Sequence, residues 1–91
     1  MAGRLLIFGL GYSGAAIARA AQAAGWDVTA TSRDPERAAP PPGTRLVAFE
    51  DAAPTLAEAT HIVATAPPDE NGDPVLVRFG AELAAAPARW A

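Results

Sequence analysis

Three glycines near the amino terminus are the residues whose spacing most directly suggests chemistry. They form the pattern G-x-G-x-x-G and are Gly9, Gly11 and Gly14. The pattern follows an apolar run, residues 4–8, which is typical of a strand buried on both faces of a parallel sheet. It leads into an alanine-rich segment, residues 13–24, which favours a helix and is followed by Gly25. The glycines are therefore predicted to lie at a junction between a strand and a helix.

Each glycine has a separate physical role at such a junction. Gly9 allows a tight turn, Gly11 lets backbone approach a pyrophosphate closely, and Gly14 lets the helix pack on the strand. The N–H groups and the positive dipole end of the new helix attract phosphates, so a diphosphate can bind there without any lysine. The stretch predicts a dinucleotide-binding turn, with a purely structural turn as the alternative.

The end of the next predicted strand, residues 26–31, bears on the choice of dinucleotide. In a dinucleotide-binding fold the residue at this strand end meets the adenosine ribose, and proteins that select NAD usually have an acid there. This chain has Ser32 and Arg33 instead, which can donate hydrogen bonds to a 2′-phosphate. We therefore expect NADP in preference to NAD. The alternative is that Arg33 is a solvated loop residue paired with Asp34 or Glu36.

The rest of the chain predicts two more strands, 45–49 and 61–65, and two more helices, 54–59 and 74–86. The last helix carries an apolar stripe that is predicted to face the sheet: Val75, Leu76, Phe79 and Leu83. The elements together predict an α/β, Rossmann-like NAD(P)-binding fold with an open parallel sheet of strand order 3-2-1-4. Residues 1–91 would form one NAD(P)-binding domain, the amino-terminal half of such a fold, with the next strand and the catalytic part beyond Ala91.

Two further strand ends supply candidate contacts. Asp51 or Ala52, after the third strand, could line an adenine, although an acidic cap for the following helix is an equal alternative. Small residues leaving the fourth strand could let a ribose pass close to the backbone, unless the prolines after them simply end the strand. These small residues are Ala64, Thr65 and Ala66.

The composition argues against several other functions. A net charge of −3 gives no basic field for nucleic acid, which is therefore not expected as a partner. The chain has no cysteine and no lysine, so disulfides, thiolate metal sites and lysine-based catalysis are excluded for these residues, and no metal is expected. The single histidine, His61, is predicted to begin a strand at the sheet end away from the cofactor and is interpreted as structural.

A chain without cysteine is expected in a reducing compartment, here the cytoplasm. Its apolar start, which ends in Ala18-Arg19-Ala20, resembles a secretory signal, but the glycine pattern and the second strand favour a folded domain. The same stretch is too short and too rich in glycine to span a bilayer, so no membrane partner is expected. The sequence leaves association into a homodimer open.

The chain resembles the nucleotide-binding amino terminus of the extended short-chain dehydrogenase/reductase family, the NAD(P)-dependent epimerases and dehydratases. The resemblance covers residues 4–51 and extends more loosely to Ala66. It rests on four motifs: Gly11-Tyr12-Ser13-Gly14, Gly25-Trp26-Asp27-Val28, Phe49-Glu50-Asp51-Ala52 and Ile62-Val63-Ala64-Thr65-Ala66. The family usually has a glycine where this chain has Phe8, so the spacing matches a divergent branch.

The resemblance implies a set of cofactor contacts. The pyrophosphate would be cradled by Gly9, Gly11, Tyr12, Ser13 and Gly14. The adenosine ribose or its phosphate would meet Ser32 and Arg33, the adenine would touch Asp51 and Ala52, and residues 64–66 would border the nicotinamide-side ribose. The family's catalytic Ser/Thr and Tyr-x-x-x-Lys lie further along its chain, and no residue here matches them. The small-molecule substrate, a sugar nucleotide or a similar hydroxyl or carbonyl compound, would be met by that later part.

Two other interpretations use the same residues. Residues 7–11 together with 28–33 also resemble the NADP-binding start of β-hydroxyacid dehydrogenases, whose catalytic lysine also lies downstream. A regulatory nucleotide-sensing module, such as those on potassium-uptake channels, is an alternative in which cofactor occupancy shifts conformation and no hydride moves. Such modules usually carry an acid at the position of Ser32, which argues against this alternative.

Overall fold

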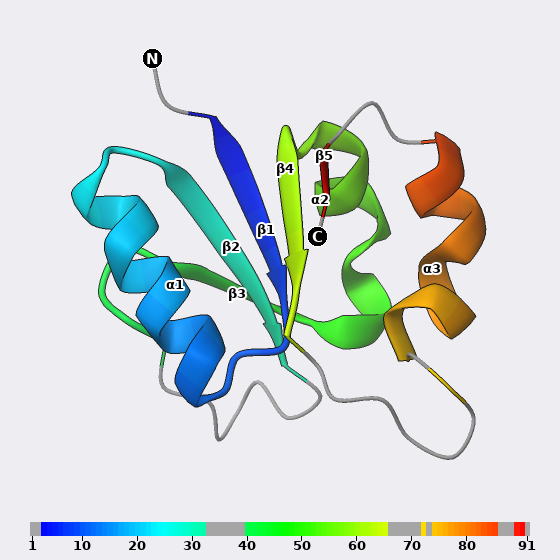
Figure 1. Ribbon diagram of the computed structural model, residues 1–91, viewed down its shortest axis with the longest axis horizontal. Helices are drawn as coiled ribbons and strands as arrows, with labels where there is room; N and C mark the ends of the chain where they lie inside the picture. Colours follow the sequence, from blue (N-terminus) through cyan, green and yellow to red (C-terminus); the bar gives the residue numbers. More distant parts are fainter. Residues whose placement is uncertain (1–2, 33–39, 66–71, 73, 86–88, 91) are drawn as a thin grey trace.

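The fold is a parallel sheet with helices on both of its faces (Figure 1). The computed structural model describes residues 3–32, 40–65, 72, 74–85 and 89–90, without the side chains of Tyr12, Arg89 and Trp90. The strands are β1 (Arg4–Phe8), β2 (Asp27–Ser32), β3 (Arg45–Ala48), β4 (His61–Ala64) and β5 (Arg89–Trp90). The helices are α1 (Tyr12–Ala23), α2 (Ala53–Glu58) and α3 (Pro74–Ala85), and a 3₁₀ turn, η1 (Phe49–Asp51), precedes α2.

The strands follow the spatial order β3-β2-β1-β4-β5, and every neighbouring pair is parallel. This confirms the α/β class and the predicted order 3-2-1-4 for the first four strands. The expectation that the next strand begins beyond Ala91 is wrong, because Arg89 pairs with His61 and Trp90 with Ile62. Two residues are too few to give a periodic pattern, which is why the sequence did not predict this strand.

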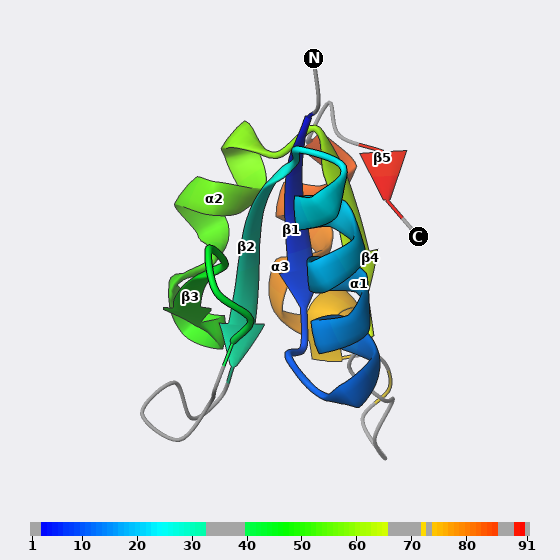
Figure 2. The same ribbon diagram turned by 90° about the vertical axis from the view of Figure 1, so that its left-hand side faces the viewer.

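β1 is apolar and buried from Leu5 to Phe8 because both of its faces are covered there. Successive side chains of a strand point to opposite faces, so Leu5 and Ile7 pack on the α1 side while Leu6 and Phe8 pack on the side of α2 and α3. Figure 2, turned by 90°, shows α1 and α2 on opposite sides of the sheet. The buried, unalternating run at the chain's start is therefore the centre of the sheet, as predicted.

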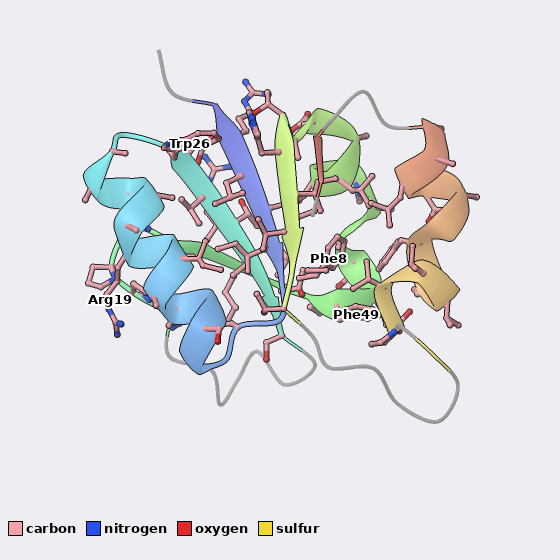
Figure 3. The ribbon with its side chains drawn as sticks, in the orientation of Figure 1. Phe8, Arg19, Trp26 and Phe49 are labelled. Atoms are coloured by element: carbon pink, nitrogen blue, oxygen red, sulfur yellow. The ribbon has the colours of Figure 1, made fainter. Side chains whose placement is uncertain are left out.

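Three phenylalanine rings fill the core on the side of α2 and α3. The ring centroid of Phe79 lies 5.4 Å from that of Phe8 and 5.3 Å from that of Phe49, and Phe8 and Phe49 are 6.0 Å apart. Figure 3 shows the Phe8 and Phe49 side chains directed into this layer. Phe49 was predicted to end the third strand, but that strand ends at Ala48. The backbone turns into η1, which brings the Phe49 ring into the core.

The predicted apolar stripe of α3 holds for three of its four residues. Val75, Phe79 and Leu83 are buried, whereas Leu76 is 46% exposed, so its placement in the stripe is wrong. Phe79 has a non-helical backbone (φ −123°, ψ 17°), and this kink changes the angle between the two halves of the helix. A helical-wheel argument assumes one straight helix and therefore misplaces Leu76.

The boundaries of α1 depend on glycine at both ends. Gly11 is the N-cap, and Gly25 follows the helix with φ of +87°, a conformation that L side chains rarely adopt. The predicted stop at Gly25 is thus confirmed. α1 returns the chain to the start of β2, so β1, α1 and β2 form one crossover unit with its turn at the carboxyl end of β1.

Phe79→Ala should lower the free energy of unfolding by about 3–5 kcal/mol, because it removes a fully buried ring that contacts two others. Val77→Ala is the matched control, since Val77 lies on the same helix but is 68% exposed, and should change stability by less than about 0.5 kcal/mol. Urea unfolding followed by circular dichroism measures both. Equal losses in the two variants would contradict the three-ring core.

Candidate functional site

The glycine turn lies at the carboxyl end of β1, between the ends of β2 and β4. From β1 the chain continues to β2 and β3 on one side, and it later returns to β4 on the other side. In open α/β sheets, ligands bind in the crevice at such a change of direction, outside the carboxyl ends of the strands. The position of the turn therefore makes it the candidate binding site.

The end of β2 holds the turn on one side through Thr31. The N–H of Gly9 donates to the Thr31 hydroxyl oxygen at 3.1 Å, and the N–H of Leu10 donates to the Thr31 carbonyl oxygen at 2.9 Å. Gly9 has φ of +101°, which glycine adopts without strain. The structure therefore gives Gly9 the predicted role in the tight turn.

Thr65, which follows β4, holds the turn on the other side. Its N–H donates to the Phe8 carbonyl oxygen at 2.9 Å and continues the ladder between β1 and β4. Its hydroxyl lies 2.6 Å from the Gly9 carbonyl oxygen and 3.2 Å from that of Phe8. The turn is thus bound to both strands that flank β1.

Gly14 and Gly11 differ in the space around the position where a side chain would begin. A Cβ atom on Gly14 would lie 2.3 Å from the Gly9 carbonyl oxygen, so the close packing of α1 on the turn requires glycine. A Cβ atom on Gly11 would meet nothing within 4 Å in the described chain, and the Gly11 backbone (φ −122°, ψ −156°) is extended. Gly14 therefore serves internal packing, whereas Gly11 leaves open space at the start of the helix.

Some of the other predicted cofactor contacts lie within the described residues, and some lie outside them. Ser13 is exposed in the first turn of α1, and Ser32 is half-buried as the last residue of β2. The backbone of Tyr12 begins α1, while its side chain, Arg33 and Ala66 lie outside the described residues. Ala64 ends β4 opposite Phe8 and is half-buried. Ser32 and Ala64 are thus at strand ends on either side of β1.

Asp51 and Ala52 differ sharply in accessibility. Ala52 is fully buried in the core, whereas the Asp51 side chain is exposed. The alternative that an acid caps the following helix is wrong, because Ala52 is the N-cap of α2 and no side chain caps it. The acidic residues Glu50 and Asp51 belong to η1, which precedes α2. Because α2 begins at Ala53, its N-cap is the alanine at position 52.

The η1 turn is linked to α3 by an ion pair. The Nε of Arg78 donates to a carboxylate oxygen of Glu50 at 2.7 Å, and the guanidinium carbon lies 4.8 Å from the centre of the Phe79 ring. The hydrogen bond to Glu50 raises the pKa of Arg78 above its ordinary value. Both side chains are exposed, so the pair adds little to stability.

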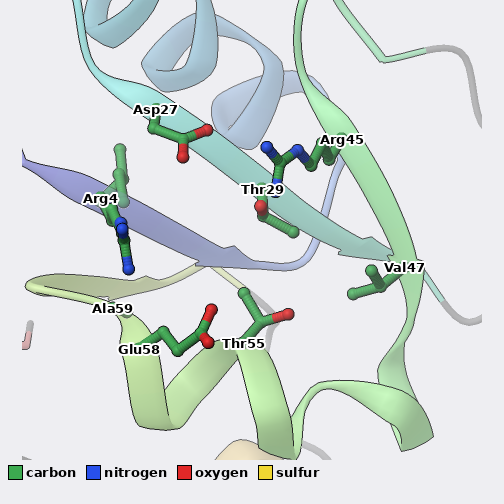
Figure 4. Close-up of a pocket in the computed structure, with 9 residues that line it drawn as sticks. Arg4, Asp27, Thr29, Arg45, Val47, Thr55, Glu58 and Ala59 are labelled. Carbon is green, nitrogen blue, oxygen red and sulfur yellow. The ribbon is translucent and has the colours of Figure 1, made fainter.

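A cavity of about 350 Å³ lies on the side of α2, beside the first halves of β1, β2 and β3 (Figure 4). Its rim carries charges of both signs: Arg4, Asp27, Arg45 and Glu58. Thr29 lines it from β2 and Thr55 from α2. None of the predicted cofactor contacts lines this cavity, because they lie at the opposite ends of the strands.

His61 begins β4, as predicted, at the sheet end away from the glycine turn. Its ring centroid lies 4.7 Å from that of Trp26, and its Nδ1 lies 3.0 Å from the Thr60 hydroxyl. Among the described residues, no three His, Cys, Asp or Glu side chains come together as metal ligands would. No helix in the described part of the chain is long and apolar enough to cross a membrane.

Sequence reasoning identified the glycines but missed Thr31. A buried threonine in a strand is usually attributed to β propensity, and nothing in the pattern indicates that its hydroxyl accepts a bond from a turn 22 residues earlier. Thr65 was predicted as a cofactor contact, yet its hydroxyl is bonded to the turn itself. The one feature that the two residues share in the sequence is a threonine within one residue of the end of each strand beside β1.

Solved structures define the fold. A conserved protein described as functionally unknown, from Silicibacter pomeroyi DSS, is 36% identical over 91% of this chain and 30% of its own, with a TM-score of 0.76. A D-isomer specific 2-hydroxyacid dehydrogenase from Xanthobacter autotrophicus Py2 is 27% identical over 96% of this chain and 28% of its own, with a TM-score of 0.74. The fold is of the Rossmann type. A phosphoglycerate dehydrogenase from Lactobacillus plantarum is 32% identical over 75% of this chain and 21% of its own, with a TM-score of 0.64.

The chain spans less than a third of the length of each of these three proteins. No family model and no curated protein matches it. Of these three proteins, the two with named activities are dehydrogenases, which is consistent with a nucleotide-binding domain of the Rossmann type. The finer likeness to epimerases and dehydratases rests on the sequence motifs alone.

Gly14→Ala should lower the free energy of unfolding by about 1–3 kcal/mol, because the new methyl group would collide with the Gly9 carbonyl oxygen. Gly80→Ala is the matched control, since Gly80 is helical and its Cβ would meet no atom of the described residues within 4 Å. That control should leave stability unchanged or raise it by up to about 1 kcal/mol. Thermal or urea unfolding measures both, and an unaltered Gly14→Ala variant would contradict the packing of α1 on the turn.

Proposed function

We propose that this chain is the dinucleotide-binding part of an NAD(P)-dependent oxidoreductase and that it prefers NADP. The observation that carries the proposal is the open space at Gly11. Glycine is required there neither by the extended backbone nor by any described atom within 4 Å. A missing side chain matters at Gly11 if a diphosphate must approach the first turn of α1.

The residues around the turn fit such a cofactor. The N–H groups that open α1 supply donors, and the helix dipole supplies partial positive charge without a lysine. In the proposal the pyrophosphate lies along Gly9, Gly11, Tyr12, Ser13 and Gly14. The adenosine ribose and its 2′-phosphate lie beside Ser32 and Arg33, and the adenine lies near Asp51 and Ala52. Residues 64–66 border the nicotinamide side.

When bound, the nicotinamide would supply hydride transfer to or from a carbon that bears a hydroxyl or a carbonyl. The residues of this chain would hold and orient the cofactor. The acid–base groups would belong to a further part of a longer protein, because no residue here matches them. The four motifs that resemble those of epimerases and dehydratases support a sugar nucleotide or a similar polar compound as the substrate.

A hydroxyacid dehydrogenase is the second candidate for the longer protein. It is supported by the dehydrogenase activities for which the Lactobacillus plantarum and Xanthobacter autotrophicus neighbours are named. The residues 7–11 and 28–33, which resemble β-hydroxyacid dehydrogenases, support it too. Turnover of NADP by the protein that contains this chain, with sugar nucleotides and with hydroxy acids in parallel, separates the two candidates.

Gly11→Ala should weaken NADPH binding at least tenfold, because the added methyl group occupies the space through which the diphosphate approaches. Gly80→Ala introduces the same methyl group away from the turn and should bind NADPH as the wild type does. Fluorescence titration measures the affinities, and circular dichroism checks that both variants are folded. A folded Gly11→Ala variant with wild-type affinity would contradict the proposed path of the diphosphate.

The wild type should bind NADPH at least tenfold more tightly than NADH, and Arg33→Asp should reverse this order. The guanidinium attracts a 2′-phosphate, whereas a carboxylate repels it and accepts hydrogen bonds from a free ribose. Arg19→Asp, an exposed position on α1, makes the same change in net charge and is the control. Equal affinities of the wild type for the two dinucleotides would refute the preference for NADP.

A further inference from the structure

We propose that Thr31 and Thr65 are positioning residues that hold Gly9 from both sides and so determine which N–H groups bind the phosphates. The proposal rests on the dinucleotide-binding function proposed above. Neither hydroxyl needs to touch the cofactor in this role. Both act through the backbone of the turn.

Both polar backbone groups of Gly9 are bonded within the protein. Its N–H reaches the Thr31 hydroxyl oxygen at 3.1 Å, and its carbonyl oxygen accepts from the Thr65 hydroxyl at 2.6 Å. The second distance is at the short end of the usual range for hydroxyl donors. The N–H and the carbonyl of Gly9 belong to the two peptide groups on either side of its Cα atom. The other ends of these two groups are bonded as well, through the Phe8 carbonyl oxygen and the N–H of Leu10, so neither group can rotate to present an N–H to a ligand without breaking bonds.

Thr31 also accepts a hydrogen bond from the next N–H group of the turn, that of Leu10. The N–H of Leu10 donates to the Thr31 carbonyl oxygen at 2.9 Å, and the N–H of Ala15 is bonded to the Gly11 carbonyl oxygen at 2.9 Å. The N–H groups between them, residues 11–14, are those that open α1, and such groups lack partners within a helix. The phosphates are therefore met from Gly11 onward, where Gly11 leaves open space.

The arrangement gives Thr65 a role different from direct contact with a ribose. A threonine hydroxyl has one hydrogen, and Thr65 donates it to main-chain carbonyl oxygens of β1 and the turn. A Cβ atom on Gly14 would lie 3.4 Å from this hydroxyl oxygen, so the first turn of α1 packs against the same group. Thr65 thereby ties β4, the glycine turn and the start of α1 together.

The two threonines also set the spacing across the crevice. Thr31 immediately precedes Ser32, the residue assigned to the adenosine ribose, while Thr65 follows Ala64 on the nicotinamide side. Because both bind Gly9, the phosphate-binding turn stays at a fixed distance from the two sites where the halves of the cofactor would lie. Loss of either hydroxyl would free one side of the turn.

Thr31→Val and Thr65→Val test the proposal, because valine keeps the shape and removes the hydroxyl. Thr31→Ser and Thr65→Ser restore the hydroxyl. Thr29→Val is the matched control, since Thr29 is a buried threonine that points to the same face of β2 but lines the cavity at the other end. Affinities for NADPH and for adenosine 2′-monophosphate, which has no diphosphate, are measured on folded protein.

Each valine variant should bind NADPH at least tenfold more weakly, with less than a twofold change for adenosine 2′-monophosphate. The serine variants and Thr29→Val should stay within twofold of the wild type for both ligands. Valine variants that keep NADPH affinity, or that lose both ligands equally, would overturn the proposal. If the wild type fails to bind NADPH, the dinucleotide-binding function proposed above is itself refuted. The wild type is therefore measured before any variant.

Amide hydrogen exchange of the wild type provides the test if a valine variant does not fold. The N–H groups of Gly9 and Leu10 should exchange at least tenfold more slowly than those of residues 11–14, because Gly9 and Leu10 donate to Thr31, whereas the first N–H groups of a helix have no partner within the helix. Addition of NADPH should then slow exchange at residues 11–14. Fast exchange at Gly9 and Leu10 would overturn the proposal.

Discussion

The site depends on one constraint: the turn after β1 must bend sharply while its backbone groups stay bonded in the middle of a sheet. Gly9 meets the first requirement with φ of +101°, and Thr31 and Thr65 meet the second from the two neighbouring strands. A buried peptide group without a partner would cost about 1–3 kcal/mol, so these bonds favour a single conformation of the turn. A ligand that approaches the start of α1 therefore meets a turn whose backbone is held in one conformation.

Much of this architecture follows from the sequence because local patterns and the global fold agree. The unbroken apolar run of β1 indicates a strand covered on both faces, and α1 together with α2 and α3 provides the two covers. Glycines 9, 14 and 25 mark positions where a side chain would be strained or would collide. Such local signals need no knowledge of distant contacts, which is why the strand order and the helix positions could be predicted.

What the sequence did not show depends on contacts between distant residues. The bond from Gly9 to Thr31 and the bond from Thr65 to Gly9 span 22 and 56 residues, and a threonine gives no sign of its partner. The kink at Phe79 and the turn of Phe49 into η1 accompany the packing of three rings from distant parts of the chain. Leu76 is therefore exposed and β3 is shorter than the periodic pattern predicts. The accessibility of Asp51 and the burial of Ala52 likewise followed from η1.

The most direct test of the central claim is a crystal structure of the protein with NADPH. The account predicts diphosphate oxygens about 2.7–3.2 Å from backbone nitrogens of residues 11–14, with Gly9 still bonded to both threonines. It also predicts the 2′-phosphate at the end of β2. A dinucleotide bound instead in the cavity between Arg4 and Arg45, or a turn that opens to offer the N–H of Gly9 to a phosphate, would contradict the account.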